Sequence, residues 1–336
     1  MSLINRIPLL LLLLALLSCK GNTGNQATDT TDSHASRTIP TFNADSAYAY
    51  IAAQVAFGTR VPGTPTHAAC ADYLASEMTR HGAQVIRQQA RVTAYDGTVL
   101  PITNIIASFN PEAQTRILLC AHWDTRPWAD HDPNAANHHT PILGANDGAS
   151  GVGVLLEIAR LIGRDTLSIG IDLILFDAED YGTPHWESEE VRLREDNDLT
   201  WCLGSQYWAA NPHKPNYTAR YGILLDMVGA ENTIFCKEGF SMEYAAPIVE
   251  KVWSAAAANG YSHLFRNQLG GYVTDDHLPV NRRAGIPCIN IIGSDPTGRG
   301  FHSVWHTVKD DMTCIDPTIL QAVGHTLLTV LYNEPQ

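Results

Sequence analysis

The sequence predicts an α/β fold in which helices cover a mixed, mostly parallel sheet. Short apolar runs alternate along the chain with longer amphipathic segments, which is typical of this fold class. One of the runs, at 116–121, is almost continuously apolar, as in parallel strands that are buried on both faces. A content of 45% hydrophobic and 17% charged residues fits a chain that buries a large core.

The first half of the domain contains two helices and three strands. Apolar residues three or four positions apart predict helices over 46–57 and 67–81. Alternation with a period of two predicts an antiparallel pair of strands at a sheet edge, over 83–93 and 100–108. The continuous apolar run at 116–121 predicts a buried parallel strand.

The second half repeats this alternation and supplies the rest of the sheet. Helical segments at 150–161, 242–259 and 317–332 separate or follow strand-like runs at 169–176, 219–227 and 286–292. The sequence shows no internal repeat, and about three hundred residues can form one large domain. We therefore expect a single catalytic domain over 39–336.

The N-terminus has the composition of an export signal. Arg6 precedes an almost pure leucine run, which is too short to span a bilayer comfortably, and this predicts a signal peptide over 1–18. Cys19 follows a small residue, as the lipidated cysteine of a bacterial lipoprotein does; the alternative is an ordinary secretory signal with an incidental cysteine. The polar stretch 19–38 has no apolar period and predicts a flexible tether.

These features predict an exported, periplasmic protein that is anchored to the inner or outer membrane only through acyl chains on Cys19. A net charge of −13 argues against nucleic acid or anionic lipid surfaces as partners. Cys120 and Cys288 lie within apolar runs, so we expect them to be buried thiols, and no cysteine metal site is indicated.

Polar residues follow the predicted strands at the points where they end. His122 and Asp124 follow the strand at 116–121, Glu179 and Asp180 follow the strand at 169–176, and Asp226 lies at the end of the strand at 219–227. In open α/β sheets, sites form beyond the carboxyl ends of the strands. Adjacent carboxylates are costly there without a cation, so one of Glu179 and Asp180 can bind metal while the other acts as a general base or acid.

Two further residues complete a possible metal site, although each has an ordinary alternative. Asp147 precedes a predicted helix, where an Asp commonly caps the N-terminus, and His306 alone would fit a surface loop. Two Asp and one His nevertheless form a zinc-type ligand set with an open fourth position, and other divalent metals also fit. Asp124 could orient the His122 imidazole, and the cluster 275–277 could be a helix cap or part of the site.

Taken in order, these motifs resemble those of the zinc-aminopeptidase fold group, the M28 metallopeptidases. Within that group the sequence is most similar to glutaminyl-peptide cyclotransferases of Bacteroidetes-type bacteria, from Asp45 to the C-terminus. The motifs that carry this resemblance are FDAEDYG at 176–182, WCLGSQYW at 201–208, LLDMVG at 224–229, DDHLP at 275–279 and VWHT at 304–307.

The resemblance implies a three-layer αβα fold and one Zn²⁺ per chain. It assigns the zinc ligands to Asp147, Asp180 and His306. It assigns proton transfer to Glu179, with Asp226 and Asp275 in an acidic hydrogen-bond network beside it. Trp305 and Trp186 match walls of the substrate pocket. The chain departs from the animal enzymes at two positions, since Asp180 replaces a Glu and Asn290 replaces a His.

The activity implied is cyclisation of the N-terminal Gln of peptides or proteins to pyroglutamate, with release of ammonia. One alternative is a two-zinc aminopeptidase, because His122 and Asp226 match the additional ligands that such enzymes use. Another alternative is a peptide-binding lipoprotein without catalytic activity, which fold alone does not exclude.

Overall fold

The structure is a computed structural model that describes residues 38–165, 167–194 and 197–335. The predicted signal peptide, Cys19 and all but the last residue of the predicted tether lie outside this part of the chain. Among the described residues, no helix is both long enough and apolar enough to cross a membrane.

The described strands form one mixed sheet, as predicted. In chain order they are β1 (Gln84–Thr93), β2 (Val99–Phe109), β3 (Arg116–His122), β4 (Gly170–Phe176), β5 (Gly222–Asp226), β6 (Ile234–Lys237), β7 (Phe265–Leu269) and β8 (Cys288–Ser294). Their order across the sheet is β1-β2-β4-β3-β5-β8-β6-β7. The four central strands β4, β3, β5 and β8 are parallel, and β1, β2 and β6 add antiparallel pairings toward the edges.

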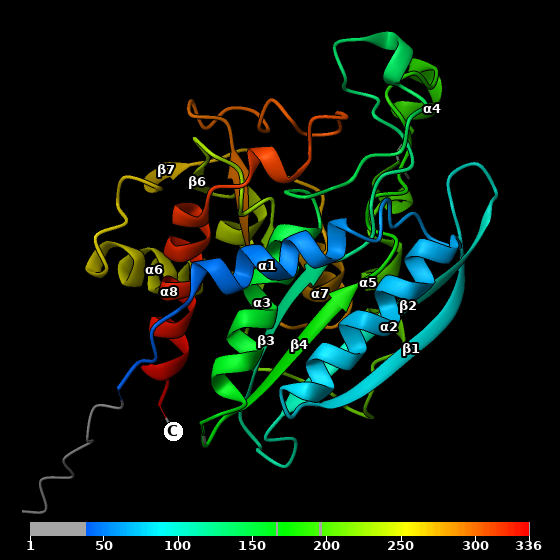
Figure 1. Ribbon diagram of the computed structural model, residues 1–336. Helices are drawn as coiled ribbons and strands as arrows, with labels where there is room; N and C mark the ends of the chain where they lie inside the picture. The colour runs from blue at the N-terminus through cyan, green and yellow to red at the C-terminus, as the bar shows by residue number, and fades with distance from the viewer. Residues whose placement is uncertain (1–37, 166, 195–196, 336) are drawn as a thin grey trace, which may run out of the picture. The chain divides into compact units, whose positions relative to one another are not determined.

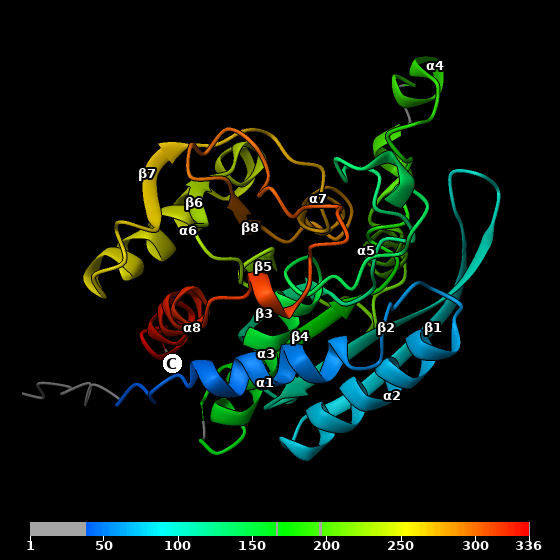
Figure 2. The ribbon, with the colours of Figure 1, turned by 45° about the horizontal axis from the view of Figure 1, so that its top comes forward.

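The helices cover both faces of this sheet. They are α1 (Ala44–Val55), α2 (Pro65–Arg80), α3 (Ala149–Ile162), α4 (Glu189–Arg192), α5 (Leu203–Ala210), α6 (Gly239–Ala258), α7 (His277–Arg282) and α8 (Pro317–Tyr332). Figures 1 and 2 show α1, α2, α3 and α8 on one side of the sheet, with α5 and α7 on the other. The predicted three-layer arrangement is therefore confirmed.

Side chains of β3 show how the two layers share one strand. Ile117 and Leu119 belong to the large core cluster beneath α1, α3 and α8. The residues between them, Leu118 and Cys120, belong to the smaller cluster beneath α5 and α7. This alternation explains why the strand is apolar from Ile117 to Ala121, since both of its faces are buried.

Most predicted elements are confirmed with boundary shifts of up to three residues. The sequence patterns did not reveal β6, β7, α5 or α7. β6 has only four residues and β7 exposes all but its first, so neither produces a long apolar run. The prediction for Cys120 and Cys288 is confirmed, and all six cysteines of the described chain are buried and unpaired.

Candidate metal centre

The carboxyl ends of three neighbouring strands bring the predicted polar residues together. His122 is the last residue of β3 and Asp226 is the last residue of β5, the strand beside it. Glu179 and Asp180 follow β4, which flanks β3 on its other side. Each of the four side chains is less than a tenth exposed. The sheet order thus gathers four ionisable groups at one buried edge.

Asp147 joins this group because it does not cap α3. The N-cap is Gly148, with φ of +92° and no side-chain hydrogen bond to the helix. A Cβ at Gly148 would lie 2.7 Å from the Asp124 carbonyl oxygen and 3.1 Å from His122 Cε1, so only glycine fits this close approach. The turn leaves the Asp147 carboxylate free to face His122 and His306 instead.

The first ligand set consists of Asp147, Asp180 and His306, whose ligand atoms lie within 4.8 Å of one another. His306 Nε2 is 3.1 Å from Asp180 Oδ1 and 3.6 Å from Asp147 Oδ2. Asp180 Oδ2 is buried and has no hydrogen-bond partner. An orphaned carboxylate oxygen beside an imidazole is the arrangement that a divalent cation would satisfy.

A second set shares Asp147 with the first. His122 Nε2 lies 3.0 Å from Asp147 Oδ1 and 3.3 Å from Asp226 Oδ1. The ligand atoms of these three residues also lie within 4.8 Å of one another. Asp147 therefore directs one carboxylate oxygen toward each histidine. The donor atoms can accommodate either one ion at the first set or two ions bridged by Asp147.

Burial of these acids has a large electrostatic effect. It raises the pKa of Glu179 well above its usual value, with added repulsion from Asp275 and Asp180. Burial also raises the pKa of Asp180, Asp226 and Asp275, the last to about 7. Carboxyl groups packed this closely favour either protonation or a bound cation.

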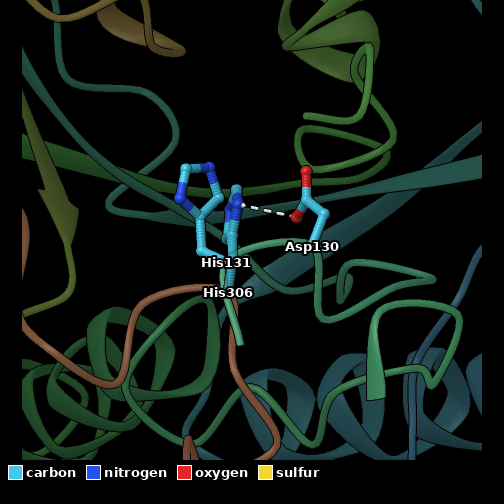
Figure 3. Close-up of side chains that lie close together, drawn as sticks. All are labelled: Asp130, His131 and His306. Carbon is cyan, nitrogen blue, oxygen red and sulfur yellow. Dashed lines mark ion pairs between the residues drawn. The ribbon is translucent and has the colours of Figure 1, made fainter. Parts of the chain in front are cut away.

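The buried Asp130 and the exposed His131 both lie beside His306. His306 Nδ1 is 3.4 Å from Asp130, while the His131 ring lies against His306 with centroids 5.6 Å apart (Figure 3). Arg126 donates two hydrogen bonds of 2.7 Å to the Asp130 carboxylate and a third, of 3.0 Å, to the Asp180 carbonyl. These bonds outweigh burial and hold the pKa of Asp130 below its usual range, so it stays ionised beside His306.

Asp124 lies beside the His122 imidazole, which the sequence suggested it could orient, and it also contacts the segment that follows β4. Its carboxylate accepts hydrogen bonds from the backbone N–H groups of Glu179 at 3.0 Å and of Asp180 at 3.2 Å. The distance from Asp124 Oδ1 to His122 Nδ1 is 3.4 Å. Asp124 therefore positions the adjacent Glu179 and Asp180 as well as contacting the imidazole.

A cavity of about 440 Å³ opens onto these groups. Glu179, Asp226 and Asp275 all line it. Asp275 Oδ2 accepts a hydrogen bond of 2.6 Å from Asn290 Nδ2, so the position where the animal enzymes carry His still contributes to the acidic network. The cavity therefore ends at a metal site with a protonatable carboxyl group beside it.

Tryptophans form the outer walls of this cavity, although not both of the predicted ones. Trp305 lines it and stacks on His306 with centroids 3.8 Å apart. The second tryptophan is Trp201, whose ring is nearly parallel to that of His306 with centroids 6.1 Å apart. Trp186 is 38% exposed and contacts Trp128, His138 and His139. The prediction of Trp186 as a wall is not supported by this placement.

The backbone around the site is strained at non-glycine residues. Ala178, Met227 and His306 have φ of +51°, +50° and +53°, in the left-handed region that such residues rarely adopt. Ala178 precedes Glu179, and Met227 follows Asp226. Strain of this kind concentrates at functional sites, where the surrounding structure compensates for it.

Comparison with known proteins identifies the family. Residues 104–331, more than half of the chain, match the model for peptidase family M28. The chain belongs to peptidase family M28. This confirms the fold group that the sequence motifs resemble.

Solved M28 structures resemble this chain over nearly all of its described residues. A glutaminyl cyclase from Bacteroides thetaiotaomicron is 55% identical with a TM-score of 0.86, and the match covers 89% of this chain and 100% of that one. A structure from the same organism described as a leucine aminopeptidase precursor is 54% identical with a TM-score of 0.85, covering 89% and 99%.

A curated relative with lower sequence identity supports the same similarity. The glutaminyl-peptide cyclotransferase of Gloydius blomhoffii is 28% identical over 246 residues, which span 65% of this M28 chain and 61% of the viper enzyme. The similarity to glutaminyl cyclases that the sequence motifs indicate is therefore confirmed.

Proposed function

We propose that this M28 chain is a zinc-dependent glutaminyl-peptide cyclotransferase that converts N-terminal Gln of peptides and proteins to pyroglutamate. The observation that carries this proposal is the 55% identity to a bacterial glutaminyl cyclase over the whole length of that chain. The cavity agrees with it, because Trp305 and Glu179 line it together with the candidate metal ligands Asp147, Asp180 and His306.

Asp147, Asp180 and His306 are the proposed zinc ligands. A metal ion held there would supply a Lewis acid for the carbonyl oxygen of the substrate's side-chain amide. Two carboxylates and one imidazole match the ligand types that zinc takes in open catalytic sites.

Glu179 is the proposed proton shuttle of the reaction. The substrate's α-amine attacks the side-chain amide carbon, and Glu179 takes a proton from that amine. The carboxyl group then returns the proton to the leaving nitrogen as the carbon–nitrogen bond breaks, and ammonia is released. The raised pKa of Glu179 suits this double role, since the group must hold a proton briefly near neutral pH.

Trp305 and the acidic pair Asp226 and Asp275 are proposed to orient the substrate. Because the nucleophile and the electrophile belong to the same residue, much of the rate gain comes from holding the chain in the cyclising conformation. Trp305 would press on that residue and exclude water, while the two acids, which also line the cavity, would bind the α-amine.

A two-metal aminopeptidase is the second candidate, favoured by one specific observation. His122, Asp147 and Asp226 form a complete second ligand set that shares Asp147 with the first. In that reaction Glu179 would activate water instead of the substrate's amine.

One experiment separates these functions. The purified chain is incubated with a Gln-initiated and a Leu-initiated peptide, products are identified by mass, and bound zinc is counted. Loss of ammonia from the first peptide alone, with about one zinc per chain, supports the cyclotransferase. Release of leucine with about two zinc ions supports the aminopeptidase. No reaction with zinc bound would favour a peptide-binding protein.

We also propose that the chain is exported to the periplasm and tethered through lipidated Cys19. The leucine run before Cys19 and the polar stretch after it support this proposal. Labelling of cells with a radioactive fatty acid tests it: the wild-type chain should incorporate the label and Cys19→Ser should not. Equal labelling of the two would exclude Cys19 as the anchor.

A further inference from the structure

The Glu179 carboxylate has an unusual hydrogen-bond partner. Cys202 Sγ donates to Glu179 Oε1 over 3.2 Å, and this is the only hydrogen bond to that carboxylate within the described chain. Cys202 is 2% exposed, and burial raises the pKa of its thiol well above the usual value. The sulfur therefore carries its hydrogen at neutral pH and acts as the donor.

The backbone fixes the distance between these two residues. Cys202 N–H donates to the Glu179 carbonyl and Leu203 N–H donates to the Ala178 carbonyl, each over 3.0 Å. Cys202 has φ of +57° and Ala178 has φ of +51°. Both residues hold costly left-handed conformations at the point where the two segments meet, which indicates that the surrounding fold maintains this junction.

Cys202 also lines a second cavity. This cavity, of about 150 Å³, lies away from the metal ligands and is lined by Cys202 together with residues such as Leu199, Leu278 and Arg282. Cys202 does not line the catalytic cavity, whereas Glu179 does. The thiol therefore lies behind the carboxylate and is placed to restrain it without contacting a substrate.

We infer that Cys202 is a positioning residue, whose thiol holds the Glu179 carboxylate in the orientation that faces the catalytic cavity. The inference rests on the proposed role of Glu179 and holds for cyclisation and for peptide hydrolysis alike. A thiol is a weak donor, so it orients the carboxylate while leaving the oxygens available for proton transfer. Serine keeps a donor at the same place, and alanine removes it.

The test compares Cys202→Ala and Cys202→Ser with the wild-type holoenzyme. Cys70→Ala is the matched control, since Cys70 is an equally buried thiol in the core beneath α2. Cys202→Ala should lower kcat about tenfold with little change in KM, and Cys202→Ser should recover most of that loss. Zinc content and thermal stability should match those of Cys70→Ala.

A double-mutant cycle makes the test specific. Adding Cys202→Ala to Glu179→Gln should lower the residual rate no further, because the group that the thiol positions is already gone. Unchanged kcat in Cys202→Ala, a serine variant as slow as the alanine variant, or additive losses in the double mutant would each overturn the inference.

Infrared spectroscopy gives a reading that does not depend on turnover. The S–H stretching band of Cys202, assigned by its loss in Cys202→Ala, should move to higher frequency in Glu179→Gln as the hydrogen bond weakens. An unmoved band would contradict the pairing. If the wild-type chain cyclises no Gln peptide and releases no leucine, the proposed function fails, while this band still decides the pairing.

Discussion

The carboxylate of Asp310 accepts a hydrogen bond of 3.0 Å from the backbone N–H of Asp147, across 163 residues of sequence. The same carboxylate accepts a second bond, of 2.7 Å, from the N–H of Asn146. Asp310 is 1% exposed. Burial and the neighbouring negative charge of Asp147 together raise the pKa of Asp310 to about 7. Asp310 therefore orients the backbone at 146–147, which carries Asp147, the residue shared by the two ligand sets. Asp310 is itself a member of neither set.

Asp310→Asn should weaken metal binding. The amide NH₂ of Asn would face one of the two N–H donors, so one bond would be lost and the 146–147 turn would shift. Loss of such a supporting group typically lowers metal affinity 10–100-fold. Competition with a chromophoric chelator measures this change. Asp311→Asn is the control, since the Asp311 side chain accepts hydrogen bonds from the nearby Thr313 and from no ligand-bearing segment of the described chain; equal affinity in the two variants would contradict the prediction.

Glu179→Gln should lower kcat by about 10²–10⁴-fold, because an amide cannot accept and return the proton. Zinc content should stay the same, since Glu179 lies outside the first ligand set. Ammonia release and elemental analysis of the purified variant measure the two quantities. Glu190→Gln, on the exposed helix α4, serves as control and should retain full activity. If Glu179→Gln were as active as this control, Glu179 would not be the proton shuttle.

Trp305→Ala and Trp186→Ala should have different effects on catalysis. Trp305 lines the cavity. Its loss should reduce kcat/KM by about tenfold or more, because the substrate would be held less firmly and water would enter the cavity. Trp186 lies outside the cavity lining and should change kcat/KM less than twofold, about the scatter expected of a surface substitution. Steady-state kinetics on one Gln peptide compares them. Similar losses in both variants would place Trp186 against the substrate after all.

His213 should make the fold sensitive to acid. Burial lowers the pKa of His213 to about 4, and its Nδ1 accepts a 3.2 Å hydrogen bond from Trp208 Nε1. In the unfolded chain it gains a proton below about pH 6.5. The unfolded state therefore binds more protons between pH 6.5 and 4, and the folded state loses stability as the pH falls through that window.

His213→Asn should reduce that loss, because Asn Oδ1 can accept from Trp208 without titrating. Between pH 7 and pH 5 the wild type should lose about 1 kcal/mol more unfolding free energy than the variant, after allowance for partial exposure of the ring. Urea denaturation at the two pH values tests this. His263→Asn, at an exposed position, is the control, and a variant as acid-sensitive as wild type would refute the prediction.

The sheet and the polar residues at the carboxyl ends of its strands could be predicted because both depend on local patterns. From Ile117 to Ala121 the run is apolar at every position, which predicts burial on both faces. The same pattern marks where each strand ends, and parallel strands place their ends at one edge. His122 and Asp226 therefore come together through topology alone.

The supporting residues could not be predicted, because their roles depend on contacts between distant segments. Asp310 contacts Asp147, and Arg126 contacts Asp180 54 residues away. The ambiguity of Asp147 as cap or ligand was resolved only by the left-handed backbone at Gly148. Trp186 and Trp201 are close in sequence, in a segment without a regular spacing of apolar residues. No sequence pattern therefore indicated which of the two lines the cavity.

The stack of Trp201, His306 and Trp305 makes the centre optically observable. The His306 ring is nearly parallel to two indole rings, with centroids 3.8 Å from that of Trp305 and 6.1 Å from that of Trp201. A protonated imidazole quenches indole fluorescence by contact, and a metal ion on the same ring replaces its proton. Two of the seven tryptophans of this chain should therefore change their emission when the centre is loaded or emptied, so occupancy can be followed in solution without an added dye.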